Sequence, residues 1–94
     1  MHEIIHAFYE NKGSFYIEIN TKRLAEMNYV VGNDRKLIIE HTDVHESLKG
    51  QGIGKKLLEE LVKYARKQHV SVLPLCPFAN AMLKKTPEWQ DVLG

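Results

Sequence analysis

Apolar and polar side chains alternate along the first half of the chain with the period of two that is typical of half-buried β-strands. One alternating segment covers residues 14–20 and a second covers residues 23–31. Asn20 and Thr21 lie between them and favour a tight turn. Residues 37–44 are rich in β-branched and apolar side chains and predict a third strand. These strands are expected to form an antiparallel meander.

The hydrophobic period changes to that of an α-helix after residue 52, where apolar residues recur every three or four positions and charged residues fill the opposite face. A short apolar run at residues 70–75 predicts a strand parallel to the third one across this helix. Pro77 suits the first turn of a second helix that ends near residue 85. Phe78 and Trp89 are expected to be core residues.

The predicted fold class is therefore α+β: a three-stranded antiparallel meander, a βαβ crossover to a fourth strand, and a short C-terminal helix. A chain of 94 residues is expected to form a single domain, spanning residues 1–94.

Composition and charge exclude several classes of function. The net charge is +1, from 13 basic and 12 acidic residues. The chain therefore lacks the excess of basic residues that is typical of a nucleic-acid-binding protein. The sequence contains no run of about 18 apolar residues, so we expect neither a membrane span nor a membrane partner. The single cysteine, Cys76, cannot form an internal disulfide, which fits a cytoplasmic location.

The segment Lys49-Gly50-Gln51-Gly52-Ile53-Gly54-Lys55 places three alternate glycines between a strand and a helix. Glycines let the backbone approach a ligand, and the free N–H groups of a helix N-terminus attract phosphate oxygens. The P-loop pattern fails, because the position of its first glycine is occupied by Lys49. The dinucleotide pattern fails as well, because its third glycine would fall at Lys55.

The same segment resembles motif A of the GNAT acyltransferase superfamily, with Lys49, Gly52 and Gly54 at its basic and glycine positions. Val44-His45 stands where many members have Val-His-Pro, and the leucine-rich helix follows in register. The runs at residues 74–78 and 87–89 resemble those of the short YjdJ-type GNAT-like proteins.

The resemblance implies a minimal GNAT-like fold that uses acetyl-coenzyme A as cofactor. It implies that main-chain N–H groups of the glycine-rich turn contact the pyrophosphate, that the end of the third strand pairs with pantetheine, and that Lys49 adds positive charge. The implied cofactor-binding residues are Thr42, Val44, Lys49, Gln51, Gly52, Ile53, Gly54 and Lys55.

Three residues are candidates for catalysis. Cys76 is expected where the fourth strand ends and a helix begins, and in GNAT proteins the acyl thioester lies between the third and fourth strands. Its thiol could accept the acyl group, or it could simply be a small buried apolar residue. Glu40 and His41 lie on opposite faces of the third strand, and either could deprotonate an amine or be a plain sheet residue. His41 is expected to be partly covered. The histidines show no metal-ligand spacing.

These observations predict an acetyl-coenzyme A-dependent N-acetyltransferase with an unknown amine acceptor, acting by direct attack or through an acyl-Cys76 intermediate. The alternative is a non-catalytic module that binds or senses acyl-coenzyme A, and a third possibility is a small interaction domain. The chain is much shorter than a usual GNAT domain and is expected to lack the helices and closing strands that often form the acceptor pocket.

Overall fold

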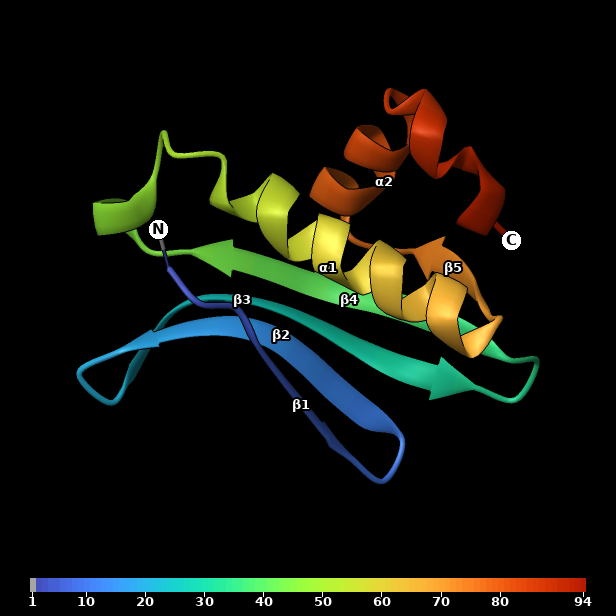
Figure 1. Cartoon of the computed structure of the whole chain (residues 1–94), viewed down its shortest axis with the longest axis horizontal. Coiled ribbons are helices and arrows are strands. Elements are labelled where there is room, and N and C mark those ends of the chain that lie inside the picture. Colours follow the sequence, from blue (N-terminus) through green and yellow to red (C-terminus); the bar gives the residue numbers. More distant parts are fainter. Residues whose placement is uncertain (1) are drawn as a thin grey trace.

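The computed structural model describes residues 2–94 and contains a five-stranded sheet whose strands lie side by side in chain order (Figure 1). The first four strands pair antiparallel, and the fifth pairs parallel to the fourth. The strands are β1 (Ile5–Tyr9), β2 (Lys12–Ile19), β3 (Lys22–Gly32), β4 (Lys36–Val44) and β5 (Ser71–Pro74). The α+β class and the parallel crossover are confirmed. The antiparallel part has four strands, so the predicted three-stranded meander is one strand short.

The additional strand β1 was absent from the prediction because its sequence, Ile5-His6-Ala7-Phe8-Tyr9, does not alternate between apolar and polar residues. It is an edge strand, and four of its five residues are exposed. Its anchor is His6, whose ring stacks on Phe15 with 4.1 Å between ring centroids. The Nε2 atom of His6 also lies 2.6 Å from the hydroxyl oxygen of Tyr29 on β3. Contacts with β2 and β3 therefore hold this strand in place.

Helix α1 (Ile53–Gln68) connects β4 to β5 and packs its apolar face across the sheet (Figure 1). Leu57, Leu58, Leu61, Val62 and Ala65 have no exposed surface. Burying each of the larger side chains stabilises the fold by about 1.5–3 kcal/mol relative to leaving it in water. The predicted amphipathic helix is confirmed, and it fixes the position of the glycine-rich turn at its own beginning.

Helix α2 (Pro77–Lys84) and a 3-10 turn (Pro87–Val92) follow β5. The chain then returns to β5 and runs parallel to it, where Leu93 bridges to Val72 and the N–H of Gly94 donates to the Val72 carbonyl at 3.2 Å. Trp89 and Val92 are buried, as the sequence predicted for Trp89. No helix in residues 2–94 is long and apolar enough to cross a membrane.

A β-bulge interrupts the pairing of β3 with β4. Asn28 pairs with His41 and Tyr29 pairs with Ile39, so Glu40 has no partner on β3. Before the bulge, Ile39 belongs to the buried face of the sheet. Beyond the bulge, Thr42 pairs with the fully buried Met27, so that Thr42, rather than His41, continues the buried face. One unpaired residue thus exchanges the faces of two neighbouring side chains.

Candidate functional site: a cavity at the beginning of helix α1

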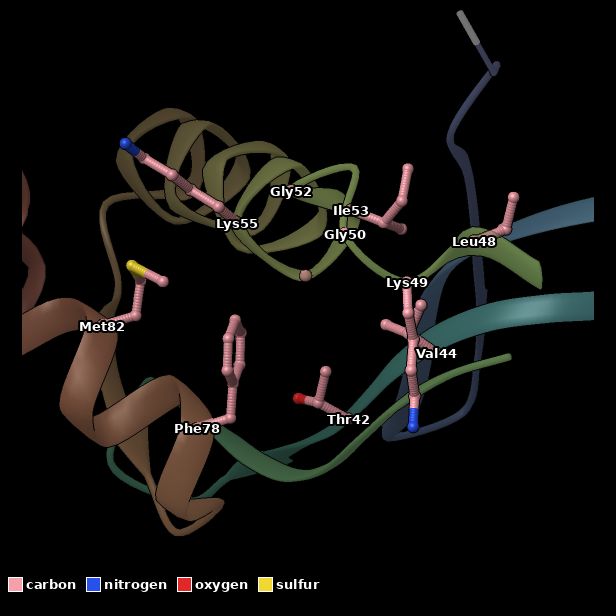
Figure 2. Close-up of a pocket in the computed structure, with 11 residues that line it drawn as sticks. Thr42, Val44, Leu48, Lys49, Gly50, Gly52, Ile53, Lys55, Phe78 and Met82 are labelled. Carbon is pink, nitrogen blue, oxygen red and sulfur yellow. The ribbon is translucent and has the colours of Figure 1, made fainter. Parts of the chain in front are cut away.

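A cavity of about 330 Å³ lies where the end of β4, the glycine-rich turn, the first turn of α1 and helix α2 meet (Figure 2). It brings together seven of the eight residues that the resemblance implied for cofactor binding. They are Thr42, Val44, Lys49, Gly52, Ile53, Gly54 and Lys55. The eighth, Gln51, does not line the cavity; its exposed side chain donates to the Ser47 carbonyl at 3.5 Å.

The glycine-rich turn has a backbone that only glycine adopts without strain. Gly50 and Gly52 have φ angles of 82° and 70°. A Cβ atom added to either would meet no protein atom within 4 Å, so their outer surfaces are open. Gly52 is also the N-cap of α1, where no side chain caps the helix and no acidic residue occupies the first turn. The first N–H groups of α1 are therefore available to an anion at the positive end of the helix dipole.

The third glycine, Gly54, serves the packing of α1 against α2. A Cβ atom at this position would lie 2.6 Å from Cζ of Phe78, which is too close for any real contact. The ring of Phe78 therefore occupies the space above Gly54 and, with Met82, forms an apolar wall of the cavity (Figure 2). Phe78 is 37% exposed, so its predicted role as a core residue is wrong. Sequence spacing alone could not show that the glycine of one helix receives the ring of another.

Two lysines add positive charge around the cavity without filling it. Lys49 lies 3.5 Å from Glu46 in an ion pair that is largely exposed on both sides. Such a pair contributes about 0–1 kcal/mol, so Lys49 can exchange its partner for another anion at little cost. Lys55 extends from α1 away from the cavity interior (Figure 2). Two lysines thus lie at the edge of the cavity, while the interior is largely apolar.

Cys76 is the N-cap residue of α2 and is 6% exposed. Its Sγ atom donates to Oγ1 of Thr42 at 3.4 Å, which connects it to the inner wall of the cavity. Burial raises the pKa of the thiol, but the Thr42 hydroxyl and the main-chain N–H groups of Ala79, Phe78 and Thr42 act in the opposite direction. Together they leave the pKa of the Cys76 thiol below its usual value. The predicted position of this cysteine, between a strand end and a helix start, is confirmed.

Glu40 and His41 do not line the cavity. Both are exposed on β4, and Glu40 lines a separate hollow beside Ser14 and Asn28. The expectation that His41 is partly covered is wrong, because the bulge at Glu40 turns His41 to the face opposite that of Ile39. Within residues 2–94, no group of three or more potential metal ligands is close enough together to hold an ion.

Comparison with known proteins identifies the same family as the resemblance of the glycine-rich segment did. The sequence pattern of the GCN5-related N-acetyl-transferase family matches residues 14–92. The solution structure of a GCN5-like protein from Staphylococcus aureus is 38% identical, with a TM-score of 0.77, and the match covers 100% of this chain and 91% of that one. No curated protein matches the sequence.

Larger proteins share the fold at low sequence identity. A ribosomal-protein-alanine N-acetyltransferase from Brucella melitensis is 15% identical, with a TM-score of 0.65, over 83% of this chain and 62% of that one. A Bacillus anthracis protein solved in complex with acetyl coenzyme A is 15% identical, with a TM-score of 0.61, over 85% of this chain and 47% of that one. The match to these larger proteins thus covers about half of their length.

Proposed function

Because the chain belongs to the GCN5-related N-acetyltransferase family, we propose that it binds acetyl-coenzyme A in the cavity at α1 and transfers the acetyl group to an amine. The observation that carries this proposal is the uncapped beginning of α1, where Gly50 and Gly52 face open space. An uncapped helix N-terminus with no acidic residue in its first turn attracts anions, and a diphosphate is such an anion.

The residues around the cavity suit the successive parts of this ligand. The N–H groups of Ile53, Gly54 and Lys55 would hold the diphosphate, with Lys49 adding charge at the entrance. The end of β4, from Thr42 to Val44, lines the interior, where its exposed main-chain groups would pair with the amides of pantetheine. Phe78 and Met82 would cover the apolar stretches of the ligand on the α2 side.

Acetyl-coenzyme A supplies the acetyl group as a thioester. In the proposed relay, the thiolate of Cys76 forms a bond to the acetyl carbon, and the bond between this carbon and the coenzyme A sulfur breaks. Coenzyme A leaves as a thiol with the proton that Cys76 released. A neutral amine then attacks acetyl-Cys76, whose sulfur leaves as a thiolate, and the amine's surplus proton passes to water. Cys76 does not itself line the cavity, but its sulfur is hydrogen-bonded to Thr42, which does. The relay gives no role to Glu40 and His41, which are exposed on β4 outside the cavity.

Mass spectrometry after mixing the protein with acetyl-coenzyme A tests the relay. We expect a gain of one acetyl group on the wild type and none on Cys76→Ala, while calorimetry shows that both bind coenzyme A. Since the chain contains a single cysteine, a thioester has only one place to form. Acetylation that persists in Cys76→Ala would refute the relay, and absence of binding by the wild type would refute the proposed function.

The second candidate is a module that binds acyl-coenzyme A without turnover. It is favoured by the short chain, whose matches to larger proteins of the fold cover about half of their length. It predicts binding without acetylation of Cys76 and without release of coenzyme A thiol over a broad panel of amines. Release of thiol with any amine would exclude it.

A further inference from the structure

The bulge in β4 has a consequence for the chemistry of Cys76. Without the extra residue Glu40, the alternation that puts Ile39 on the buried face would continue to His41 and leave Thr42 on the other side. With the bulge, the Thr42 hydroxyl reaches the sulfur of Cys76 at 3.4 Å. Bulges that redirect a side chain are a recurrent feature next to active sites.

The backbone holds the two residues in this relation. The N–H groups of Leu75 and Cys76 both donate to the carbonyl of Ile39, at 2.9 and 3.1 Å. Ile39 is the last residue before the bulge, so Cys76 is attached to the same point of β4 from which the bulge redirects Thr42. The contact therefore does not depend on a flexible side chain reaching across open space.

The Thr42 hydroxyl is well suited to a sulfur that changes its charge. Within residues 2–94, its side chain has no hydrogen-bond partner other than Cys76. A hydroxyl can accept from a neutral thiol and, after rotation, donate to a thiolate. Hydrogen bonds to a charged partner are about twice as strong as neutral ones, so the contact favours the ionised sulfur.

Nearby charged side chains do not account for the lowered pKa of the Cys76 thiol. On β4, Glu40, His41 and Asp43 are exposed, and none of them lines the cavity. On the helices packed nearby, Lys55 and Lys84 are exposed. Burial raises the pKa of Cys76, and the Thr42 hydroxyl and main-chain N–H groups outweigh it and lower the pKa, with no contribution from a charged residue.

We propose that Thr42 is a positioning residue for Cys76: placed by the bulge at Glu40, its hydroxyl stabilises the thiolate and fixes the direction of the sulfur. The meaning of this contact for acetyl transfer rests on the proposed function. The contact itself is a property of the free protein and is testable without any ligand.

The test measures the rate of Cys76 alkylation by iodoacetamide as a function of pH in the wild type, Thr42→Val and Thr42→Ser. Valine keeps the shape of threonine and removes the hydroxyl, whereas serine keeps the hydroxyl. We expect Thr42→Val to move the midpoint of the profile to higher pH and to slow alkylation at neutral pH by about tenfold. Thr42→Ser should restore most of the rate. Equal profiles for the wild type and Thr42→Val would overturn the proposal.

A matched control moves the hydroxyl to the neighbouring position. In the double variant His41→Thr with Thr42→Val, the hydroxyl lies on the outward side of the bulge, so we expect the slow profile of Thr42→Val to remain. Recovery of the wild-type profile would show that the bulge does not aim the group. Circular dichroism on each variant confirms that the fold is retained.

Coenzyme A affinity separates this inference from the proposed function. If Thr42→Val lowers affinity and leaves the alkylation profile unchanged, Thr42 is only a wall of the cavity and the inference fails. If the profile changes as expected while the wild type neither binds nor becomes acetylated, the inference holds and the proposed function fails.

Discussion

Gly52 combines two demands that a single substitution can separate. Its φ of 70° strains any residue with a side chain, although asparagine tolerates this region better than alanine does. The space beside it is open in the protein and would be filled by the ligand. Alanine should therefore strain the backbone more than asparagine does, whereas asparagine should obstruct the ligand more than alanine does.

We predict that Gly52→Asn weakens coenzyme A binding by more than about tenfold, while it lowers the melting temperature less than Gly52→Ala does. The larger asparagine obstructs the diphosphate, whereas the alanine mainly strains the backbone. Calorimetry and thermal melts on both variants measure the two effects. If affinity falls in parallel with stability across the pair, the turn affects binding only through folding.

Gly54 and Phe78 form a pair whose fit determines the contact between α1 and α2. We predict that Gly54→Ala lowers the free energy of unfolding by about 1–3 kcal/mol, because its Cβ must displace the Phe78 ring. Adding Phe78→Leu should cost less in Gly54→Ala than in the wild type. Denaturant unfolding of the four proteins of this cycle measures the coupling. Additive effects would mean that the two residues do not share the space.

At the level of elements, the hydrophobic pattern was sufficient to predict the strands and helices that bury one face at regular intervals. Strands β2 and β3 and helix α1 were predicted because each presents one face to the same core. The glycine-rich turn could also be identified, since the glycines and lysines that define it are close together in the sequence, at residues 49–55. Strand β1 could not, because an exposed edge strand needs no alternation.

The bulge at Glu40 could not be predicted from the sequence, for a different reason. The bulge arises from the pairing of β4 with β3. The alternation of apolar and polar residues within residues 37–44 does not indicate that Glu40 lacks a partner on β3. Counting by two from Ile39 therefore placed His41 on the buried face, where the structure has Thr42. The partner of Cys76 was missed for the same reason.

Strand β1 owes part of its attachment to a titratable group. Although His6 is exposed on one side, its ring is partly desolvated where it packs on Phe15 and beside Tyr29. This partial burial lowers the pKa of His6 from its ordinary value of 6.5, so the folded protein binds this proton less readily than the unfolded chain does. The associated stability is complete above pH 6.5 and decreases as the pH falls toward the lowered pKa. Burial also raises the pKa of Tyr29, which keeps its hydroxyl protonated beside His6.

We predict that the melting temperature of the wild type falls more between about pH 7.5 and pH 5.5 than that of His6→Gln, which cannot take up the proton. Glutamine retains a hydrogen-bonding group near Tyr29, so the comparison isolates the titration. Thermal melts at matched ionic strength measure both slopes. Identical slopes would show that His6 is as easily protonated in the folded protein as in the unfolded chain.

At the scale of the whole molecule, ligand binding and folding are coupled. The cavity is formed by β4, the glycine-rich turn, α1 and α2, which are contiguous only in the folded chain. A ligand that binds this cavity and not the unfolded chain must stabilise the entire fold. The proposed diphosphate contact further requires that most of this stabilisation come from the part of coenzyme A that carries the diphosphate.

We therefore predict that coenzyme A at a hundred times its dissociation constant adds about 2.7 kcal/mol to the free energy of unfolding. For a domain of this size, this raises the melting temperature by roughly 10–20 °C. Cys76→Ala should keep the increase, because its sulfur is not a contact of the diphosphate, and Gly52→Asn should lose about half of it or more at the same ligand concentration. Pantetheine, which lacks the diphosphate, should raise the melting temperature far less than coenzyme A. Equal increases from the two ligands would place the main contacts on β4 and α2, and the N–H groups of α1 would lose their proposed role.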